Sequence, residues 1–222
     1  MRICTIAFLI AAPLTAKNET AERLHEAGVV FSEIMSAPDK GIPRDLLEKA
    51  HCVVVVPGLK KGAFIFGAKY GKGFIVCRRG ARGWSAPAAV RVEGGSFGFQ
   101  IGGSETDVVL LVMNDRGADR LLASQFTLGG EGEVAAGPVG RSATAQTDAM
   151  MSAEILSWSR TRGIFAGISL QGATLRQDLD DNKDLYGRKL DNKEIVRGRV
   201  GPPKAAGRLL GLLSKYPSHD KS

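Results

Sequence analysis

The sequence predicts an α+β fold in which N-terminal helices pack on a glycine-rich, mainly antiparallel, strongly curved sheet or half-closed barrel. Three observations predict it. Apolar residues recur at helical spacing before residue 50, and short runs rich in Val, Ile and Phe, bounded by Gly or Pro, follow from residue 52. The chain also has 28 glycines in 222 residues, against a usual share of about 7%, which favours tight turns and bent strands. Helices followed by many short strands are typical of the α+β class.

Two helices are expected first. Leu24, Ala27, Phe31 and Ile34 form one apolar face over residues 18–36, and Pro43 is placed to open a second, short helix that ends at Ala50. The expected strands lie near 52–57, 62–69, 73–79, 87–92, 96–101, 107–113, 150–158 and 163–172. The remaining elements are a short helix at 114–124, a glycine-rich strand and loop at 128–140, and a polar helix or turn at 176–187.

The two ends of the chain differ from the middle. Residues 1–16 match a secretory signal with cleavage after Ala16, although a retained hydrophobic helix is the alternative. The apolar run is too short to span a bilayer, which takes about 20 residues. Residues 17–200 are expected to form one domain, and 201–222 a basic amphipathic tail that docks on the core more readily than on a membrane. We therefore expect an exported, periplasmic protein that associates peripherally with a membrane.

Cysteine and histidine residues give little sign of a metal site. Cys52 and Cys77 each lie at the edge of a predicted strand, and we expect two buried thiols rather than the disulfide that an oxidising periplasm would permit. No Cys/His spacing indicates zinc, and the three histidines are scattered. The sequence predicts no cofactor.

Charge is the strongest functional signal. The net charge is +7, and the segment between Glu48 and Glu93 contains nine Lys or Arg residues and no Asp or Glu. Such a field attracts polyanions, whether nucleic acid, anionic lipid or an acidic protein, although a merely solvated basic face is the simpler explanation. Near an anionic leaflet each cation contributes about 1 kcal/mol, which gives weak, salt-sensitive binding. The candidate binding residues are Lys60, Lys61, Lys69, Lys72, Arg78, Arg79 and Arg82.

Several motifs resemble catalytic, nucleotide-binding or calcium-binding sites, but the residues and elements around each of them do not fit such a site. Ser96 lies in a Gly-x-Ser-x-Gly pattern, but a strand rather than a helix follows it, and the only downstream histidine is His219. The segment 67–73 lacks the Ser or Thr of a phosphate loop, and the strand order of an RNA-recognition module is absent, so no specific nucleic-acid binding is expected. Residues 178–182, "DLDDN", begin like an EF-hand loop but lack its glycine and its glutamate, so a capped polar turn is favoured over a cation site.

Several blocks in order resemble the SYLF-domain family of lipid-binding proteins, over about residues 20–200. They are "IPRDLLEKAHCVVVVPGLKKGAFIFGAKYGKGFIVCR", "GWSAPAAVRVEGGSFGFQIGGSETDVVLLVMN", "LGGEGEVAAGPVGR" and "GIFAGISLQGATLRQDLDDNKDLYG". The matching motif residues, most of which look fold-determining, are Gly67, Tyr70, Gly71, Gly73, Trp84, Pro87, Gly98, Gln100, Gly102, Asp107, Gly137, Gly167, Gly172, Asn182, Tyr186 and Gly187. The signal-like N-terminus looks like the stand-alone bacterial form of the family.

The resemblance implies binding rather than catalysis. Its members bind anionic phospholipids, phosphoinositides among them in eukaryotes, and some also bind actin. We therefore predict a non-catalytic module that binds anionic phospholipid through the basic strands. The alternative is a scaffold for an acidic protein partner, actin-like or from the cell envelope, and an enzyme that uses Ser96, Asp180 or Asp181 is the least favoured interpretation. Eukaryotic members are thought to use an amphipathic helix before the domain for phosphoinositides, whereas signal-like residues stand here.

Overall fold

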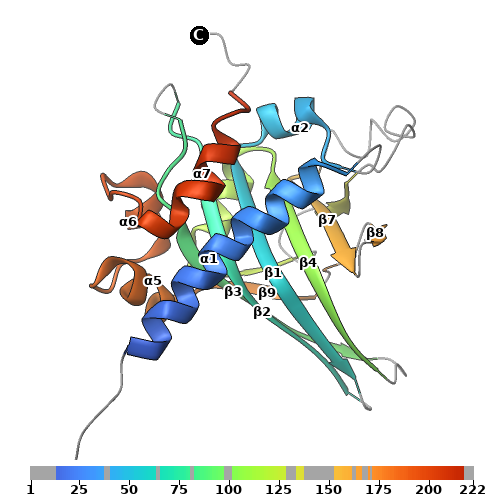
Figure 1. The fold of residues 1–222 in the computed structure, drawn as a ribbon. Coiled ribbons are helices and arrows are strands. Elements are labelled where there is room, and N and C mark those ends of the chain that lie inside the picture. The colour runs from blue at the N-terminus through green and yellow to red at the C-terminus, as the bar shows by residue number, and fades with distance from the viewer. Residues whose placement is uncertain are drawn as a thin grey trace, which may run out of the picture.

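The computed structural model describes residues 14–37, 41–63, 66–80, 83–97, 102–128, 134–137, 153–161, 164–166, 170 and 172–217. Within them lies one nine-stranded sheet with the order β5-β9-β3-β2-β1-β4-β7-β6, and β8 pairs with β7. All pairs are antiparallel except β6 with β7. The strands are β1 (Cys52–Ala63), β2 (Phe66–Cys77), β3 (Ala88–Phe97), β4 (Gly102–Val112), β5 (Gln125–Thr127), β6 (Val134–Ala136), β7 (Ile155–Thr161), β8 (Ile164–Ala166) and β9 (Thr174–Gln177). The strongly curled sheet under its helices confirms the predicted α+β class (Figure 1).

The four central strands are longer than predicted because the glycines do not interrupt them. The expected break after Pro57 is a β-bulge, where the register of β1 with β4 shifts between Val56 and Leu59. Gly58 takes a positive φ of 57° there, a conformation that glycine adopts at little cost. The carboxylate of Asp107 accepts a hydrogen bond of 3.0 Å from the Gly58 N–H. β1 therefore continues as one bent strand to Ala63, and the predicted strand 62–69 was wrong, because its residues are divided between the end of β1 and the start of β2.

The helices lie mainly on one face of the sheet and at one end of it. They are α1 (Leu14–Met35), α2 (Arg44–Lys49), α3 (Asp115–Leu121), α5 (Leu179–Tyr186), α6 (Asn192–Arg197), a 3₁₀ turn η2 (Lys204–Ala206) and α7 (Gly207–Leu213). In Figure 1, α1 crosses the sheet diagonally with α7 beside it. Leu209 and Leu213 of α7 are fully buried, so the C-terminal tail docks on the domain's own core.

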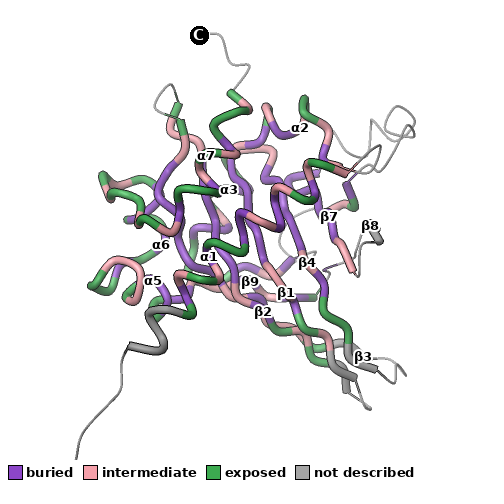
Figure 2. The backbone as a smooth tube through the Cα atoms, viewed as in Figure 1, coloured by how far each residue is buried: buried purple, intermediate pink, exposed green. Residues whose placement is uncertain are grey.

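Strand alternation divides the apolar core in two. One face of the sheet, which we call the inner face, carries Val54, Leu59 and Ile75 and packs with residues of β9, α3 and α6. The other, the α1 face, carries Val55 and Phe74 against α1, α2 and α7. In Figure 2 the buried stretch of the central strands ends where these strands project beyond α1. That projecting end of the sheet carries the lysines described below.

The cysteine prediction was wrong. Cys52 and Cys77 are direct partners across β1 and β2, with Cα atoms 3.9 Å apart, and form a disulfide. Both lie on the inner face, because directly opposite residues in an antiparallel pair share a face. Chain separation alone, at 25 residues, could not reveal this pairing.

The N-terminal prediction is not tested by the structure. Residues 1–13 of the expected signal segment lie outside the described residues, and α1 begins at Leu14, before the expected cleavage point at Ala16. In the described part of the chain, no helix combines the length and apolar character needed to cross a membrane.

Candidate functional site

The projecting end of β1 and β2 brings two of the predicted lysines together. Lys61 lies directly opposite Lys69, and both belong to the inner face, because Lys61 is two residues from the inward-facing Leu59. The flanking strands place Ser104 beside Lys61 and Gly94 beside Lys69. We call Lys61 and Lys69 the lysine pair. It is flanked by a hydroxyl and by a residue without a side chain, and neither supplies negative charge.

The lysine pair is electrostatically unfavourable in the free protein. Burial, and then the charge of Lys69, lower the pKa of Lys61 below its usual value. Like charges directly opposite each other on a sheet cost about 0.2–1 kcal/mol. No carboxylate forms an ion pair with either lysine within the described residues. An anion bound between the two ammonium groups would relieve this repulsion.

Lys60 and Tyr70 form the neighbouring pair on the α1 face. They are also direct partners across β1 and β2, and Glu105 of β4 lies in register with Lys60. Tyr70 is 47% exposed, one of two large apolar or aromatic side chains with such exposure among the described residues. Of the three lysines at this end of β1 and β2, Lys61 and Lys69 therefore share the inner face, and Lys60 lies on the reverse face.

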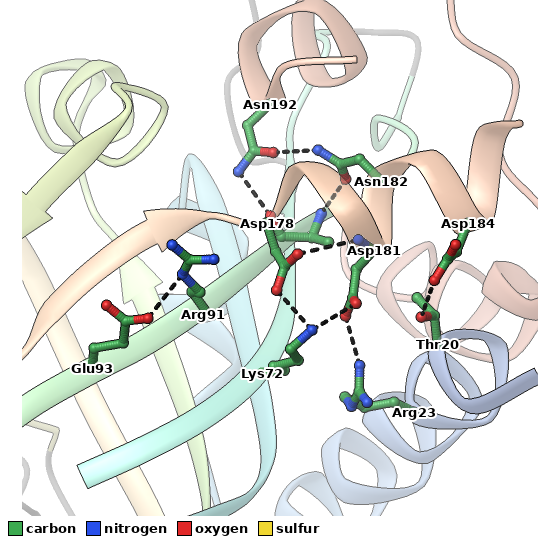
Figure 3. Close-up of polar contacts among 11 residues, drawn as sticks. Thr20, Arg23, Lys72, Arg91, Glu93, Asp178, Asp181, Asn182, Asp184 and Asn192 are labelled. Carbon is green, nitrogen blue, oxygen red and sulfur yellow. Dashed lines mark hydrogen bonds and ion pairs between the residues drawn. The ribbon is translucent and has the colours of Figure 1, made fainter. Parts of the chain in front are cut away.

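Lys72 is not part of an unopposed basic surface, and that expectation was wrong. Its ammonium group contacts Asp178 at 2.9 Å and Asp181 at 2.7 Å, and Asp181 also pairs with Arg23 of α1 at 2.6 Å (Figure 3). We call these four residues the ion-pair cluster. The carboxylates come from a segment more than 100 positions away, so a local count of charges could not reveal them. The cluster ties α1 and α5 to β2.

The ion-pair cluster makes stability depend on pH at both extremes. Burial opposes ionisation of Asp178, but hydrogen bonds and charge from Lys72, together with the Asp181 N–H, lower its pKa below the usual 3.8. For Lys72, burial is likewise outweighed by the two carboxylates, and its pKa lies above 10.5. The stabilisation from Asp178 is therefore complete above about pH 4 and is lost as the pH falls through the folded-state pKa. The stabilisation from Lys72 is complete below pH 10.5 and is lost as the pH rises through the raised folded-state pKa.

The Asp178→Asn variant tests this dependence. Asp178 also caps α5 by accepting from the Asp181 N–H at 3.1 Å, and asparagine retains that cap. We expect the variant to lose roughly 2 kcal/mol at pH 7. In urea unfolding the difference from the wild type should shrink as the pH falls below about 4. A difference that stays constant down to the lowest pH at which the protein folds would contradict an ionic origin.

Two of the predicted arginines are used within the fold. Arg78 stacks 4.2 Å from the centroid of the Trp84 ring and donates to the carbonyls of Leu47, Ala50 and Tyr216. Arg79 donates to the carbonyl of Gly198, at the end of α6. Arg82 lies outside the described residues. The guanidinium of Arg78 therefore holds α2 and the C-terminal tail.

The catalytic alternatives gain no support from the geometry. Ser96 lies within β3 and pairs with Gly67 of β2 rather than standing on a strand-to-helix turn. Asp181 is engaged in the ion-pair cluster, and Asp180 is exposed on α5. Asp178 is the N-cap of α5 and residues 179–182 form the first turn of that helix, in line with the favoured capped turn. In the part of the chain that the structure describes, no group of three or more His, Cys, Asp or Glu residues is placed to hold a metal.

Sequence reasoning missed a buried amide network beside the ion-pair cluster. Asn182, on α5, accepts from the Ala89 N–H at 2.7 Å and donates to the Leu190 carbonyl and to the Asn192 side chain. Asn192 in turn donates to the Ala89 carbonyl at 3.1 Å (Figure 3). Both side chains are fully buried. Asn182 was singled out only by its match to a family motif, and nothing in its spacing indicated its partners.

The structure is that of an α+β domain whose curled sheet carries the lysine pair at its projecting end. The model of the Ysc84 family, described as "Las17-binding protein actin regulator", matches residues 93–216. The chain belongs to this family. That finding confirms the SYLF resemblance, and the family's description names binding and actin regulation rather than a reaction.

Curated relatives agree with this assignment. An SH3 domain-containing protein of Schizosaccharomyces pombe is 39% identical over 177 residues, which is 78% of this chain and 41% of the relative. LAS seventeen-binding protein 3 of Saccharomyces cerevisiae is 34% identical over 90% of this chain and 44% of its own length. The human SH3 domain-containing YSC84-like protein 1 is 33% identical over 84% of this chain and 55% of its own length. The chain thus spans about half the length of these relatives, and they support a non-catalytic interaction role.

Proposed function

We propose that this chain is a peripheral, non-catalytic membrane-binding module and that the lysine pair binds the anionic headgroup of a phospholipid. The observation that supports it is the direct opposition of Lys61 and Lys69 on one face of the projecting strands, without a carboxylate partner among the described residues. A phosphate group accepts hydrogen bonds from several donors at once, so one headgroup contacts both ammonium groups. Binding then removes a repulsion that the free protein carries.

The expected affinity is modest. Two cations near an anionic leaflet contribute about 2 kcal/mol in total, and Lys60 on the reverse face adds to the long-range attraction. This is enough for reversible, salt-sensitive association and not for permanent anchoring. Tyr70 beside Lys60 supplies an exposed aromatic ring of the kind that occupies membrane–water interfaces. Phosphoinositide-like headgroups, which carry additional phosphates, are the proposed preferred ligands.

A second candidate is a scaffold for an acidic protein partner. The family's description favours it, because it names Las17 binding and actin regulation, and one relative is named a LAS seventeen-binding protein. The exposed Tyr70 fits a protein interface as well as a lipid surface, since aromatic residues are enriched at the centres of interfaces. The experiment below separates this candidate from lipid binding.

We also propose that the protein is exported and acts in the periplasm. The signal-like residues 1–16 support this proposal. The Cys52–Cys77 disulfide supports it independently, because structural disulfides persist mainly in oxidising compartments. Intact-mass analysis of the protein from its native host tests it, and a full-length cytosolic species with free thiols would contradict it.

The lipid proposal is tested with a Lys61→Gln/Lys69→Gln double variant. Co-sedimentation is measured with vesicles of phosphatidylcholine, alone or mixed in equal parts with phosphatidylglycerol, and with vesicles that contain a phosphoinositide. At low ionic strength we expect the double variant to bind anionic vesicles about thirtyfold more weakly than the wild type, the equivalent of about 2 kcal/mol. The difference should nearly vanish in 1 M salt, where the Debye length falls to about 3 Å.

The matched control is Lys183→Gln/Lys189→Gln, which removes two exposed lysines on or beside α5 and should leave most of the binding intact. Thermal unfolding confirms that each variant is folded, and removal of the lysine pair should not lower stability because it relieves a repulsion. Equal binding by both double variants would show that the net charge of the protein, and not the position of the lysine pair, determines its binding to anionic vesicles. Binding of an acidic protein such as actin by the wild type, without binding to anionic vesicles, would favour the second candidate.

A further inference from the structure

A cavity of about 320 Å³ lies at the opposite end of β1 and β2 from the lysine pair, over the Cys52–Cys77 disulfide. Its walls include His51, Arg79, Asp115 and Arg197, with apolar side chains from α3 and α6. The volume is at the lower end of the range found for small-molecule sites, about 300–1,000 Å³. Cys52 and Lys61 are nine positions apart along β1, or roughly 30 Å of extended chain, so this cavity is distinct from the proposed lipid site.

The strand pairing fixes the disulfide at the cavity wall. Cys52 and Cys77 are cross-strand partners. At the next pair of residues toward the end of the strands, the Arg78 N–H donates to the His51 carbonyl at 2.8 Å. Both cysteines line the cavity. Cys52 is fully buried, whereas Cys77 retains 5% exposure. Cys77 is therefore the less buried of the two residues.

The cavity has an excess of positive charge. Arg79 shares the face of Cys77, two residues away, and its hydrogen-bond acceptor is a neutral carbonyl, that of Gly198. Arg197 pairs with Asp119, which is not part of the lining. Asp115 contacts the Nδ1 atom of His51 at 2.9 Å, and its side chain is 88% exposed at the rim. Arg78 also borders the cavity, but its guanidinium is bound on the α1 face, so Arg79 and Arg197 stand against the single carboxylate of Asp115.

We propose that the Cys52–Cys77 disulfide is a thiol-exchange site, reached through this cavity and selective for small anionic thiols of the glutathione class. Cationic walls concentrate such a thiol, and a nearby guanidinium stabilises both the attacking and the departing thiolate. A disulfide whose only role is to join two strands has no need of an arginine-lined cavity beside it.

The exchange proceeds in two balanced steps. The thiolate of the small molecule attacks Sγ of Cys77, the Cys77–Cys52 bond breaks, and its electron pair leaves on Sγ of Cys52, which takes a proton from solvent. The product is a mixed disulfide on Cys77 and a free thiol at Cys52. A second thiolate then attacks the sulfur of the bound small molecule and displaces Cys77 as a thiolate. Overall, two small thiols are oxidised to their disulfide, and the protein gains two thiols.

The test uses full-length oxidised protein and two small thiols of opposite charge, 2-mercaptoethanesulfonate and cysteamine. Reduction is followed by alkylation of new thiols and peptide mass spectrometry, and each rate is divided by the rate of the same thiol with the neutral bis(2-hydroxyethyl) disulfide at the same pH. After this correction we expect 2-mercaptoethanesulfonate, the anionic thiol, to reduce the protein disulfide at least about tenfold faster than cysteamine does at low salt. The first adduct should be on Cys77.

The Arg79→Gln/Arg197→Gln variant should lose most of this preference, while the control variant Lys183→Gln should keep it. If the arginine variant does not fold, the salt dependence of the wild type decides, since the preference should fall steeply as salt is raised. Three results would overturn the proposal: free thiols at Cys52 and Cys77 in protein purified under air, exchange that requires denaturant, or equal corrected rates for the two thiols.

Discussion

Replacement of Gly73 with alanine is expected to lower the free energy of unfolding by at least about 3 kcal/mol. A Cβ atom at this position would lie 2.1 Å from the carbonyl oxygen of Val55 and 2.8 Å from Cα of Val56. Both are backbone atoms of the neighbouring strand, at the start of the β1 bulge, so no side-chain rotation relieves the overlap. The two strands must separate locally, and hydrogen bonds between them are lost.

Urea unfolding followed by circular dichroism measures the effect, with two other glycines as controls. At Gly71 the closest atom to a new Cβ is the tip of the Leu59 side chain, at 2.7 Å, and a smaller loss is expected because that side chain can move. At Gly211, in α7, a Cβ meets nothing within 4 Å, and alanine should stabilise the exposed helix by up to about 1 kcal/mol. A Gly73→Ala protein as stable as the wild type would show that β1 and β2 do not approach this closely.

The Asn182→Ala variant is expected to lose about 4 kcal/mol, the second large effect. The substitution removes three hydrogen bonds, to Ala89, Leu190 and Asn192, at a position without solvent exposure. Each bond contributes about 1 kcal/mol, and each buried group left without a partner adds a cost of its own. Because the network joins β3 to α5 and α6, the C-terminal helices should loosen first.

Hydrogen exchange together with urea unfolding measures this effect. The matched control is Asn114→Ala, which removes an amide cap from α3, where the side chain accepts from the Gly117 N–H at 2.7 Å. It should cost about 1 kcal/mol, as helix caps usually do. If the two variants lose similar stability, Asn182 acts only as a local helix residue. Asn192→Ala combined with Asn182→Ala should cost less than the sum of the single changes, because the two side chains share a hydrogen bond.

The sequence predicted those features of the fold that depend on local pattern. Apolar spacing located α1, β1 and the buried face of α7, because the periods of helices and strands are visible in the order of apolar and polar residues along a short segment. It did not predict that β1 continues through Pro57 and Gly58, since the Asp107 carboxylate that supports the bulge comes from another strand. A proline in an apparent strand usually marks its end.

The candidate site was predicted only in part, for the same reason. The charge count correctly identified a basic segment, but the partners of Lys72 come from α5, far along the chain. The opposition of Lys61 and Lys69 depends on the register of β1 with β2, which no local pattern specifies. Burial of Cys52 and Cys77 was predicted correctly, and their bond was missed because it too depends on register.

The consecutive lysines at positions 60 and 61 make the inner-face charge tolerant of a one-residue insertion in β1. If one residue were inserted in β1 before Lys60, Lys60 and Lys61 would exchange faces. Lys60 would then stand opposite Lys69, and a cation would still occupy the position that Lys61 holds in the native register. One added residue in the bulge at Gly58 would thus alter the packing of Leu59 without removing the double positive charge, whereas one deleted residue would place Gly62 opposite Lys69. The lysine doublet is a form of redundancy, through which the paired positive charge can persist in descendants that carry one inserted residue in β1.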